Sequence, residues 1–231
     1  MNISKKVLII GGTSGISLEV ARLFSVTREV VIIGRNITKI SSDQVLKSAL
    51  KFSCDIADRQ QREELLCQLK SFHIDTIIHC AGIFQTQGQN KSTYEKAYQG
   101  VKLGGVEIIR ERMRSHPEEV KNVCAISSVY TFLPDSIVPK FEKGVQEELE
   151  REIFSLSGIV ANCVAPGLVN TPLTRAAYGE DDMKEILSLA PGSRMLEPME
   201  VAREIYELSN QQEISGKVIL VDGDFLKFLA V

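Results

Sequence analysis

The sequence predicts a doubly wound α/β fold, a single domain over residues 1–231 with a seven-stranded parallel sheet covered by helices on both faces. Short β-branched runs alternate with amphipathic helical segments from end to end, which is typical of βαβ units. Several of these runs are apolar throughout, as strands buried on both faces should be. A glycine-rich turn joins the first apolar run to the first helical segment. Neither a linker nor an internal repeat divides the chain.

The alternating pattern gives the boundaries of the expected elements. The predicted strands are Lys6–Ile10, Glu29–Ile33, Leu50–Cys54, Asp75–His79, Val120–Ile126, Ile159–Val164 and Lys217–Val221. Helical spacing of apolar residues predicts crossover helices over Leu18–Phe24, Gln60–Leu69, Tyr94–Met113, Val145–Phe154 and Glu200–Leu208. The long polar stretch Thr171–Pro198 is only partly helical in pattern, and we expect it to form a substrate lid.

Composition narrows the class of protein. Hydrophobic residues make up 44% of the chain and charged residues 25%, which is typical of soluble globular proteins and not of disordered ones. The formal net charge is −3 and the basic residues form no cluster, so neither nucleic acid nor an anionic membrane is expected as a partner. The start of the chain lacks the pattern of a secretory signal, and no apolar run is long enough to span a bilayer. We therefore expect a cytoplasmic protein with a small-molecule substrate.

Cysteine and histidine show no pattern of a metal or disulfide site. The five cysteines include no Cys-x-x-Cys pair and lie mostly in apolar, strand-like runs, which indicates reduced and buried thiols. The three histidines lack metal-ligand spacing. We expect no metal.

The turn after the first strand is the first candidate binding site. The residues Gly11-Gly12-Thr13-Ser14-Gly15-Ile16-Ser17 stand between a predicted strand and a predicted helix. Glycine allows a tight turn there and a close approach of the backbone to a pyrophosphate, while the helix N-terminus offers unpaired N–H groups to the anion. The strand and helix on either side give this glycine cluster the context of a Rossmann dinucleotide-binding turn. We expect Gly11, Thr13, Ser14, Gly15 and Ile16 to bind the dinucleotide.

The end of the second strand indicates which dinucleotide. An acidic residue there would hydrogen-bond the ribose hydroxyls of NAD and repel a 2′-phosphate. The sequence has Gly34-Arg35-Asn36 instead. A guanidinium forms charge-assisted hydrogen bonds with phosphate, so Arg35 and Asn36 favour NADP (NADPH) over NAD.

Taken together, the chain resembles the short-chain dehydrogenase/reductase family along nearly its whole length. The family's glycine fingerprint matches, except that Ser17 replaces the last glycine. Four further stretches match in order: Cys54-Asp55-Ile56, His79-Cys80-Ala81-Gly82, Ala165–Thr171 and Val221-Asp222-Gly223. The resemblance implies that the following residues also contact the cofactor: Asp55, Ile56, Cys80, Ala81, Gly82, Pro166, Gly167, Val169 and Thr171.

The same resemblance implies a catalytic set of Asn, Ser, Tyr and Lys, with the Tyr and Lys four residues apart on one helix. Ser128 matches the serine, and Lys102 stands in the place of the asparagine. Lys102 would then either replace the family's ammonium or point to solvent. Tyr130 lies two residues beyond Ser128, where a loop rearrangement would bring its hydroxyl near the site.

The family's Tyr-x-x-x-Lys pair has no match. Three alignments put its two members at Ser136 and Lys140, at Pro139 and Lys143, or, by distance from Ser128, at Phe141 and Val145. None of them supplies a tyrosine. The candidate catalytic residues are Ser128, Lys140, Lys143 and Lys102.

Three functions fit these observations. The leading hypothesis is an NADP-dependent oxidoreductase acting on an unidentified carbonyl or alcohol, in which Ser128 orients the carbonyl and a lysine or water supplies the proton. The alternatives are a catalytically impaired NADP(H)-binding sensor or scaffold, and a non-redox isomerase or cyclase. Retention of Ser128 and of the lid segment favours an enzyme.

The apolar C-terminal run 225–231 is expected to pack in the core or at a subunit contact, which makes the chain a candidate homo-oligomer.

Overall fold

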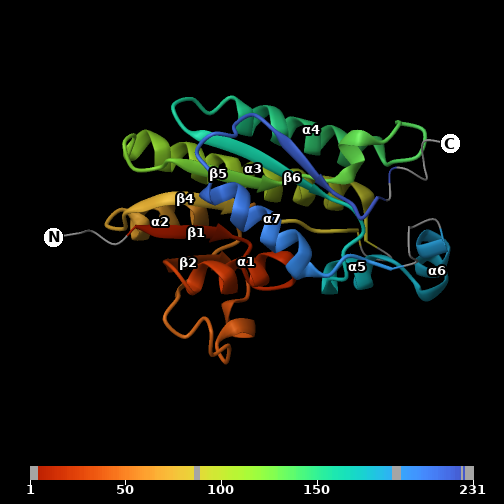
Figure 1. Ribbon diagram of the computed structural model, residues 1–231, viewed down its shortest axis with the longest axis horizontal. Coiled ribbons are helices and arrows are strands. Elements are labelled where there is room, and N and C mark those ends of the chain that lie inside the picture. The colour runs from red at the N-terminus through yellow and green to blue at the C-terminus, as the bar shows by residue number, and fades with distance from the viewer. Residues whose placement is uncertain (1–4, 86–88, 189–193, 225, 227–231) are drawn as a thin grey trace.

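The computed structural model describes residues 5–85, 89–188, 194–224 and 226. Seven parallel strands form one sheet in the order β3-β2-β1-β4-β5-β6-β7 (Figure 1). The strands are β1 Lys6–Ile10, β2 Glu29–Gly34, β3 Leu50–Ser53, β4 Ile74–His79, β5 Asn122–Ile126, β6 Val160–Pro166 and β7 Val218–Val221. The predicted doubly wound fold with seven parallel strands is therefore confirmed.

Two separate cores cover the two faces of the sheet. On one face α2 (Arg59–Leu69), α3 (Lys91–Ser115) and α4 (Lys140–Phe154) pack against alternate strand residues such as Leu8 and Ile10. On the other face α1 (Gly15–Ser25) and α7 (Pro198–Asn210) pack against the intervening residues, including Val7 and Ile9. This alternation explains why the central strands read as continuous apolar runs, because both sets of side chains are buried.

All five predicted crossover helices begin earlier than their apolar periodicity predicts, α2 by one residue, α7 by two, α1 and α3 by three and α4 by five. Helix α1 starts at Gly15 and not at Leu18, because the last residues of the glycine-rich turn already form its first turn. Helix α4 starts at Lys140 and not at Val145, directly after Pro139, which occupies its N-cap position. The extra turn of α4 places Phe141 on the helix, four residues before Val145, so that both lie on one face.

The segment after β6 is partly helical, as expected. It contains α5 (Pro172–Ala177) and α6 (Glu180–Ser188), which lie together at one end of the molecule (Figure 1). Its two ends are joined where Val169 pairs with Leu196 in an isolated parallel bridge. The connection from β2 to β3 contains the 3-10 turn η1 (Ile37–Ile40), and the connection from β5 to α4 contains η2 (Val129–Phe132).

The predicted packing of the C-terminal run lies outside the described residues, except at Leu226. Its side chain packs against Val129, Leu133 and Val138, and its backbone N–H bonds to the Asp222 carboxylate at 2.8 Å. None of the described helices has the length and apolar character needed to cross a membrane.

Candidate active site

A pocket of about 470 Å³ opens at the carboxyl ends of the central strands. Its walls come from the turns that follow β1, β2, β4 and β5, from the end of β6 and from α3, α4 and α5. Every residue that the sequence predicted to contact a dinucleotide lines this one pocket. In parallel α/β sheets ligands bind at this edge, next to the point where the strand order reverses, which here lies between β1 and β4.

The glycine-rich turn is held in a conformation that needs glycine. Gly11 has a φ of +92°, and a Cβ there would lie 2.7 Å from the Cα of Ala81 in the loop after β4. Ser17, which departs from the family's glycine, is buried, and its hydroxyl donates to the carbonyl oxygens of Gly11 at 2.5 Å and Ser14 at 2.8 Å. The serine therefore ties the turn to the first turn of α1 instead of disrupting it.

Helix α1 presents its N-terminus to the pocket without a side-chain cap. The Ser14 hydroxyl at the N-cap makes no capping hydrogen bond, whereas Asp58 and Asn90 cap α2 and α3 through the N–H groups of Gln61 and Thr93. The first N–H groups of α1 are thus left for another acceptor. An uncapped helix N-terminus that follows a glycine turn fits a bound pyrophosphate.

Basic side chains stand at the β2 end of the pocket. Arg35 and Lys39 are exposed, line the pocket, and have no carboxylate partner among the residues that the structure describes. Asp55, on the neighbouring loop, accepts the backbone N–H of Ala57 at 3.0 Å. The pocket therefore has a positively charged end where the sequence analysis expected a 2′-phosphate.

Helix α3 approaches the sheet closely enough to build the opposite wall. A Cβ at Gly104 would lie 2.0 Å from the carbonyl oxygen of Ile56, and one at Gly105 would lie 2.3 Å from the ring of His79. The His79 imidazole is fully buried and contacts the carbonyl oxygen of Lys102 through Nε2 at 2.9 Å. Burial, and then the nearby charge of Lys102, lower the pKa of His79 to about 3, so the ring stays neutral and fixes α3 against β4.

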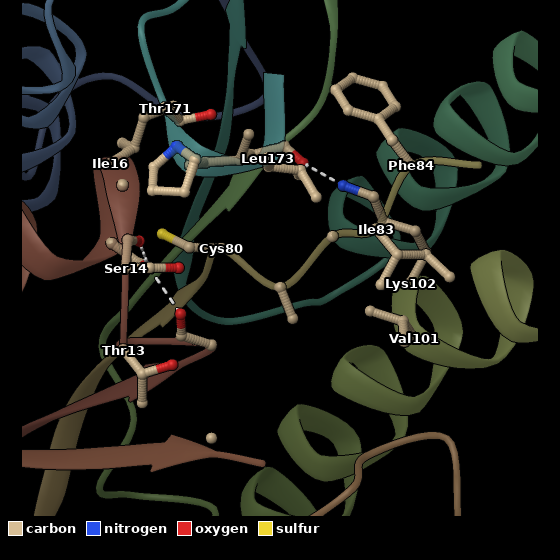
Figure 2. Close-up of a pocket in the computed structure, with 18 of the residues that line it drawn as sticks. Thr13, Ser14, Ile16, Cys80, Ile83, Phe84, Val101, Lys102, Thr171 and Leu173 are labelled. Carbon is tan, nitrogen blue, oxygen red and sulfur yellow. Dashed lines mark hydrogen bonds between the residues drawn. The ribbon is translucent and has the colours of Figure 1, made fainter. Parts of the chain in front are cut away.

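Lys102 points into the pocket and not to solvent. Only 4% of the residue is exposed, and its Nζ donates to the carbonyl oxygen of Ile126 at 3.0 Å. Figure 2 shows the amine extending from α3 across the pocket, with the turn residues Thr13 and Ser14 on the far side. Burial lowers the pKa of Lys102 to about 8. The sequence left open whether Lys102 enters the site or points to solvent, and the structure places it inside the pocket.

The other two candidate lysines lie away from the pocket. Lys140 is exposed at the start of α4, and neither it nor Lys143 is among the lining residues. The Lys143 Nζ donates to the Leu133 carbonyl oxygen and to the Asp135 carboxylate, both at 2.7 Å. Of the three candidate lysines, Lys102 is the one that lines the pocket.

Ser128 lines the pocket at the N-cap of η2. Its Oγ accepts the backbone N–H of Tyr130 at 3.2 Å, which leaves the hydroxyl proton to donate elsewhere. The adjacent Ser127 is buried and donates to the Glu150 carboxylate on α4. Tyr130 also lines the pocket, and its hydroxyl lies 3.4 Å from that of Tyr178 in the segment after β6.

Of the positions that the sequence analysis considered for the tyrosine, Phe141 lies on α4. It contacts the ring of Tyr98 from α3, with 6.2 Å between the ring centroids, and Val145, considered for the lysine, belongs to the same apolar cluster. Tyr98 lines the pocket, and the sequence analysis did not single it out. The sequence feature that could have identified Tyr98 is its position four residues before Lys102, which puts both side chains on one helix face.

The parallel sheet, the glycine turn and the pocket at the switch point define a dinucleotide-binding α/β protein. Comparison with known families is more specific, because the family model described as enoyl-(acyl carrier protein) reductase matches residues 11–225. The chain belongs to the short-chain dehydrogenase/reductase family, whose members bind NAD(P) and act on small molecules.

Relatives cover nearly the whole chain. A tropinone reductase homologue of Arabidopsis thaliana is 26% identical over 240 residues, covering 95% of this chain and 90% of that protein. The 3-oxoacyl-(acyl-carrier-protein) reductase FabG of Thermotoga maritima is 28% identical, covering 95% and 96%.

Solved structures show the same fold. The NADP-bound structure of ElxO has a TM-score of 0.78 at 25% identity and covers 97% of this chain and 99% of its own. A short-chain type dehydrogenase/reductase of Mycobacterium marinum has a TM-score of 0.84 at 20% identity, covering 96% of each chain.

Proposed function

We propose that this protein is an NADPH-dependent oxidoreductase that reduces a small carbonyl compound, or oxidises the corresponding alcohol. The observation that carries the proposal is the composition of one pocket, which combines an uncapped helix N-terminus, a basic end and a polar reaction wall. A hydride-transfer enzyme needs these three features together, because it must hold a dinucleotide and bind a substrate oxygen next to it.

The preference for NADPH rests on charge. Arg35 and Lys39 have no carboxylate partners among the described residues, and no acidic residue follows β2 to hold a ribose 2′-hydroxyl. A 2′-phosphate would gain charge-assisted hydrogen bonds from the guanidinium, whereas a 2′-hydroxyl would gain much less. The NADP-bound neighbour ElxO supports this proposal at the level of the fold and the family.

The reaction wall is proposed to act through Ser128 and Lys102. The nicotinamide supplies or accepts the hydride when it is bound. The Ser128 hydroxyl donates to the substrate oxygen and orients it. The Lys102 Nζ uses one donor on Ile126 and has two more for ribose hydroxyls or the substrate oxygen, from a position between the ends of β4 and β5.

The segment Thr171–Pro198 is proposed to be the substrate lid. Thr171, Leu173 and Ala176 line the pocket, and Tyr178 reaches back to Tyr130 and to Phe84 in the loop after β4. The contact surfaces of Phe84, Tyr130 and Leu173 are largely apolar, which favours a substrate with an apolar body next to its carbonyl group.

The deciding experiment separates binding from turnover. Calorimetric titration with NADPH and NADH should show tighter binding of NADPH, and the absorbance of the reduced nicotinamide should fall with some members of a carbonyl panel. Ser128→Ala should abolish the turnover while leaving NADPH binding intact. Tight binding with no turnover across the panel would favour the sensor or scaffold alternative. If neither nucleotide binds, the proposal is wrong.

A further inference from the structure

Helix α3 carries a tyrosine and a lysine one turn apart on the pocket wall. Tyr98 and Lys102 are four residues apart on this continuous helix, and such a spacing puts two side chains on the same helix face. Both residues line the pocket. Both are almost fully buried, with 3% of Tyr98 and 4% of Lys102 exposed, so neither side chain is an ordinary surface group.

Tyr98 lies against the α4 positions where a phenol is missing. Its ring packs on Phe141, and Val145 belongs to the same apolar cluster. Phe141 and Val145 share one face of α4 and correspond to the absent Tyr and Lys when the chain is aligned by distance from Ser128. Helices α3 and α4 contact each other along their length. A phenol that projects from α3 into this contact lies next to Gln146, the α4 side chain that lines the pocket.

The hydrogen bond that Tyr98 makes leaves its own proton available. The Gln146 Nε2 on α4 donates to the Tyr98 hydroxyl oxygen at 2.6 Å, so the phenol acts there as acceptor. Gln146 also lines the pocket, and its buried Oε1 has no hydrogen-bond partner among the described residues. Buried polar atoms are nearly always paired in folded proteins, so this oxygen is free to accept a hydrogen bond from a water or a ligand in the pocket.

Tyr98 interacts electrostatically with Tyr130, which lies on the Ser128 side of the pocket. Burial, and then Tyr178, raise the pKa of Tyr130, and Tyr98 is a further cause of that rise. The two phenols are thus close enough to interact, and Tyr130 lies two residues from Ser128. Burial also raises the pKa of Tyr98, so its hydroxyl is protonated at neutral pH.

We propose that Tyr98 is the proton donor of this site and that Lys102 is its supporting cation, so that α3 and not α4 supplies the acid. The proposal rests on the proposed reductase function. In the reducing direction the substrate carbonyl carbon accepts a hydride from the reduced nicotinamide, and its oxygen takes the proton of the Tyr98 hydroxyl. The O–H bond of Tyr98 breaks as the O–H bond of the alcohol forms, and water returns a proton to the phenolate.

The first test compares two tyrosines on the same helix. Tyr94 is as buried as Tyr98 and their ring centroids lie 5.6 Å apart, yet Tyr94 is not among the pocket-lining residues. Removal of a general acid typically lowers kcat by about 10²–10⁴-fold. Tyr98→Phe should show such a loss with unchanged NADPH affinity and a modest loss of thermal stability, because the Gln146 amide loses its acceptor. Tyr94→Phe should keep its activity. A Tyr98→Phe variant that retains activity, or Tyr130→Phe losing it instead, would overturn the assignment.

The second test needs no substrate. The titratable groups that interact with Tyr98 are Tyr94 on α3, Glu142 on α4 and Tyr130 after Ser128, and Lys102 lies one turn further along α3. If the phenol faces the nicotinamide, the positive ring of NADP⁺ should lower its pKa, and tyrosinate absorbance near 295 nm should develop at lower pH with NADP⁺ bound. The shift should appear in the wild type and in Tyr94→Phe and be absent from Tyr98→Phe.

The two tests distinguish this proposal from the proposed function. If NADPH binds and carbonyls are reduced, but Tyr98→Phe changes neither turnover nor the tyrosinate spectrum, then Tyr98 is not the donor and the reductase function stands. If the wild type binds no dinucleotide, the reductase function fails and the proton-donor assignment fails with it. If NADP⁺ lowers the pKa of Tyr98 but no carbonyl compound is reduced, Tyr98 faces the bound cofactor and the proposed reductase function is wrong.

Discussion

Arg35 and Lys102 are both cations on the pocket wall, but their surroundings give them different properties. Arg35 is exposed at the β2 end, where its charge is fully hydrated before a ligand binds. Lys102 is buried at the opposite wall, where desolvation lowers its pKa to about 8. The first residue is suited to select an anion by charge, and the second is suited to gain or lose a proton near neutral pH.

Arg35→Ala should weaken NADPH binding and leave NADH binding nearly unchanged. Hydrogen bonds to charged groups contribute about 1.5–3 kcal/mol, which corresponds to roughly a 10- to 150-fold loss of NADPH affinity. Calorimetry with both nucleotides measures the change. Arg59→Ala is the matched control, because Arg59 is exposed on α2 and pairs with Glu63 away from the pocket. An equal loss for NADPH and NADH would contradict 2′-phosphate recognition by Arg35.

Lys102 should make the stability of the ligand-free protein depend on pH in alkaline solution. Its pKa is about 8 in the folded protein and 10.5 as the ordinary value, so between these values the unfolded chain binds more protons and stability rises with pH. At higher pH the lysine is neutral in both states, and at lower pH the buried charge destabilises the fold.

The variant Lys102→Met isolates this effect. The free energy of unfolding of the wild type minus that of the variant should increase by on the order of 3 kcal/mol as the pH rises through this interval. Urea unfolding at a series of pH values measures the difference, and other titrating groups cancel in the subtraction. A difference independent of pH would show that Lys102 is not desolvated.

Among the elements, α3 has the greatest influence on the site. Gly104 and Gly105 allow it to pack directly on Ile56 and His79, and this close contact brings Lys102 and Tyr98 to the pocket wall. Helix α4 also contains a glycine, Gly144, but a Cβ there would have no neighbour within 4 Å. The two helices therefore offer a matched pair of substitutions.

Gly104→Ala should destabilise the protein and weaken cofactor binding. Its Cβ would lie 2.0 Å from a backbone oxygen, so α3 or the loop after β3 must move. Overpacking of this kind costs about 1–3 kcal/mol, and more where backbone must shift. Gly144→Ala should instead stabilise α4 by up to about 1 kcal/mol, because alanine is the better helix former. Thermal unfolding and NADPH titration of both variants measure the contrast, and equal effects would contradict the close approach of α3.

The elements themselves were largely predictable from sequence, whereas the partners of α3 were not. The predicted strand Lys6–Ile10 matches β1 residue for residue, because an apolar run bounded by polar residues leaves little choice. The start of α1 was missed by three residues, since glycine and serine in its first turn resemble a loop. The four-residue spacing of Tyr98 and Lys102 was visible in the sequence, but their place opposite Phe141 depends on how α3 and α4 pack.

Across the whole molecule, the pocket is built at one edge of the sheet from segments far apart in sequence. The glycine turn after β1, the serine after β5 and the segment after β6 meet there because parallel strands bring their carboxyl ends to the same side. The segment after β6 reaches the rest of the site through Tyr178, whose ring centroid lies 6.3 Å from that of Phe84 and whose hydroxyl lies 3.4 Å from that of Tyr130. If this segment is the substrate lid, as proposed, its closure and the completion of the substrate site should be coupled.

Hydrogen exchange on α5 and α6 should report this coupling. NADPH should slow amide exchange in Pro172–Ala177 and Glu180–Ser188, because Thr171 and α5 line the pocket that it fills.

Tyr178→Ala removes an aromatic contact and a hydroxyl contact, each contributing about 0.5–1.5 kcal/mol, so it should raise KM for the carbonyl substrate by roughly tenfold and speed exchange in both helices. NADPH affinity should stay within about twofold of the wild type, because Tyr178 is not among the residues that line the dinucleotide pocket. Lys184→Ala, on the exposed side of α6, is the control and should change neither quantity. A Tyr178→Ala variant with an unchanged KM and unchanged exchange would show that the segment after β6 covers no substrate.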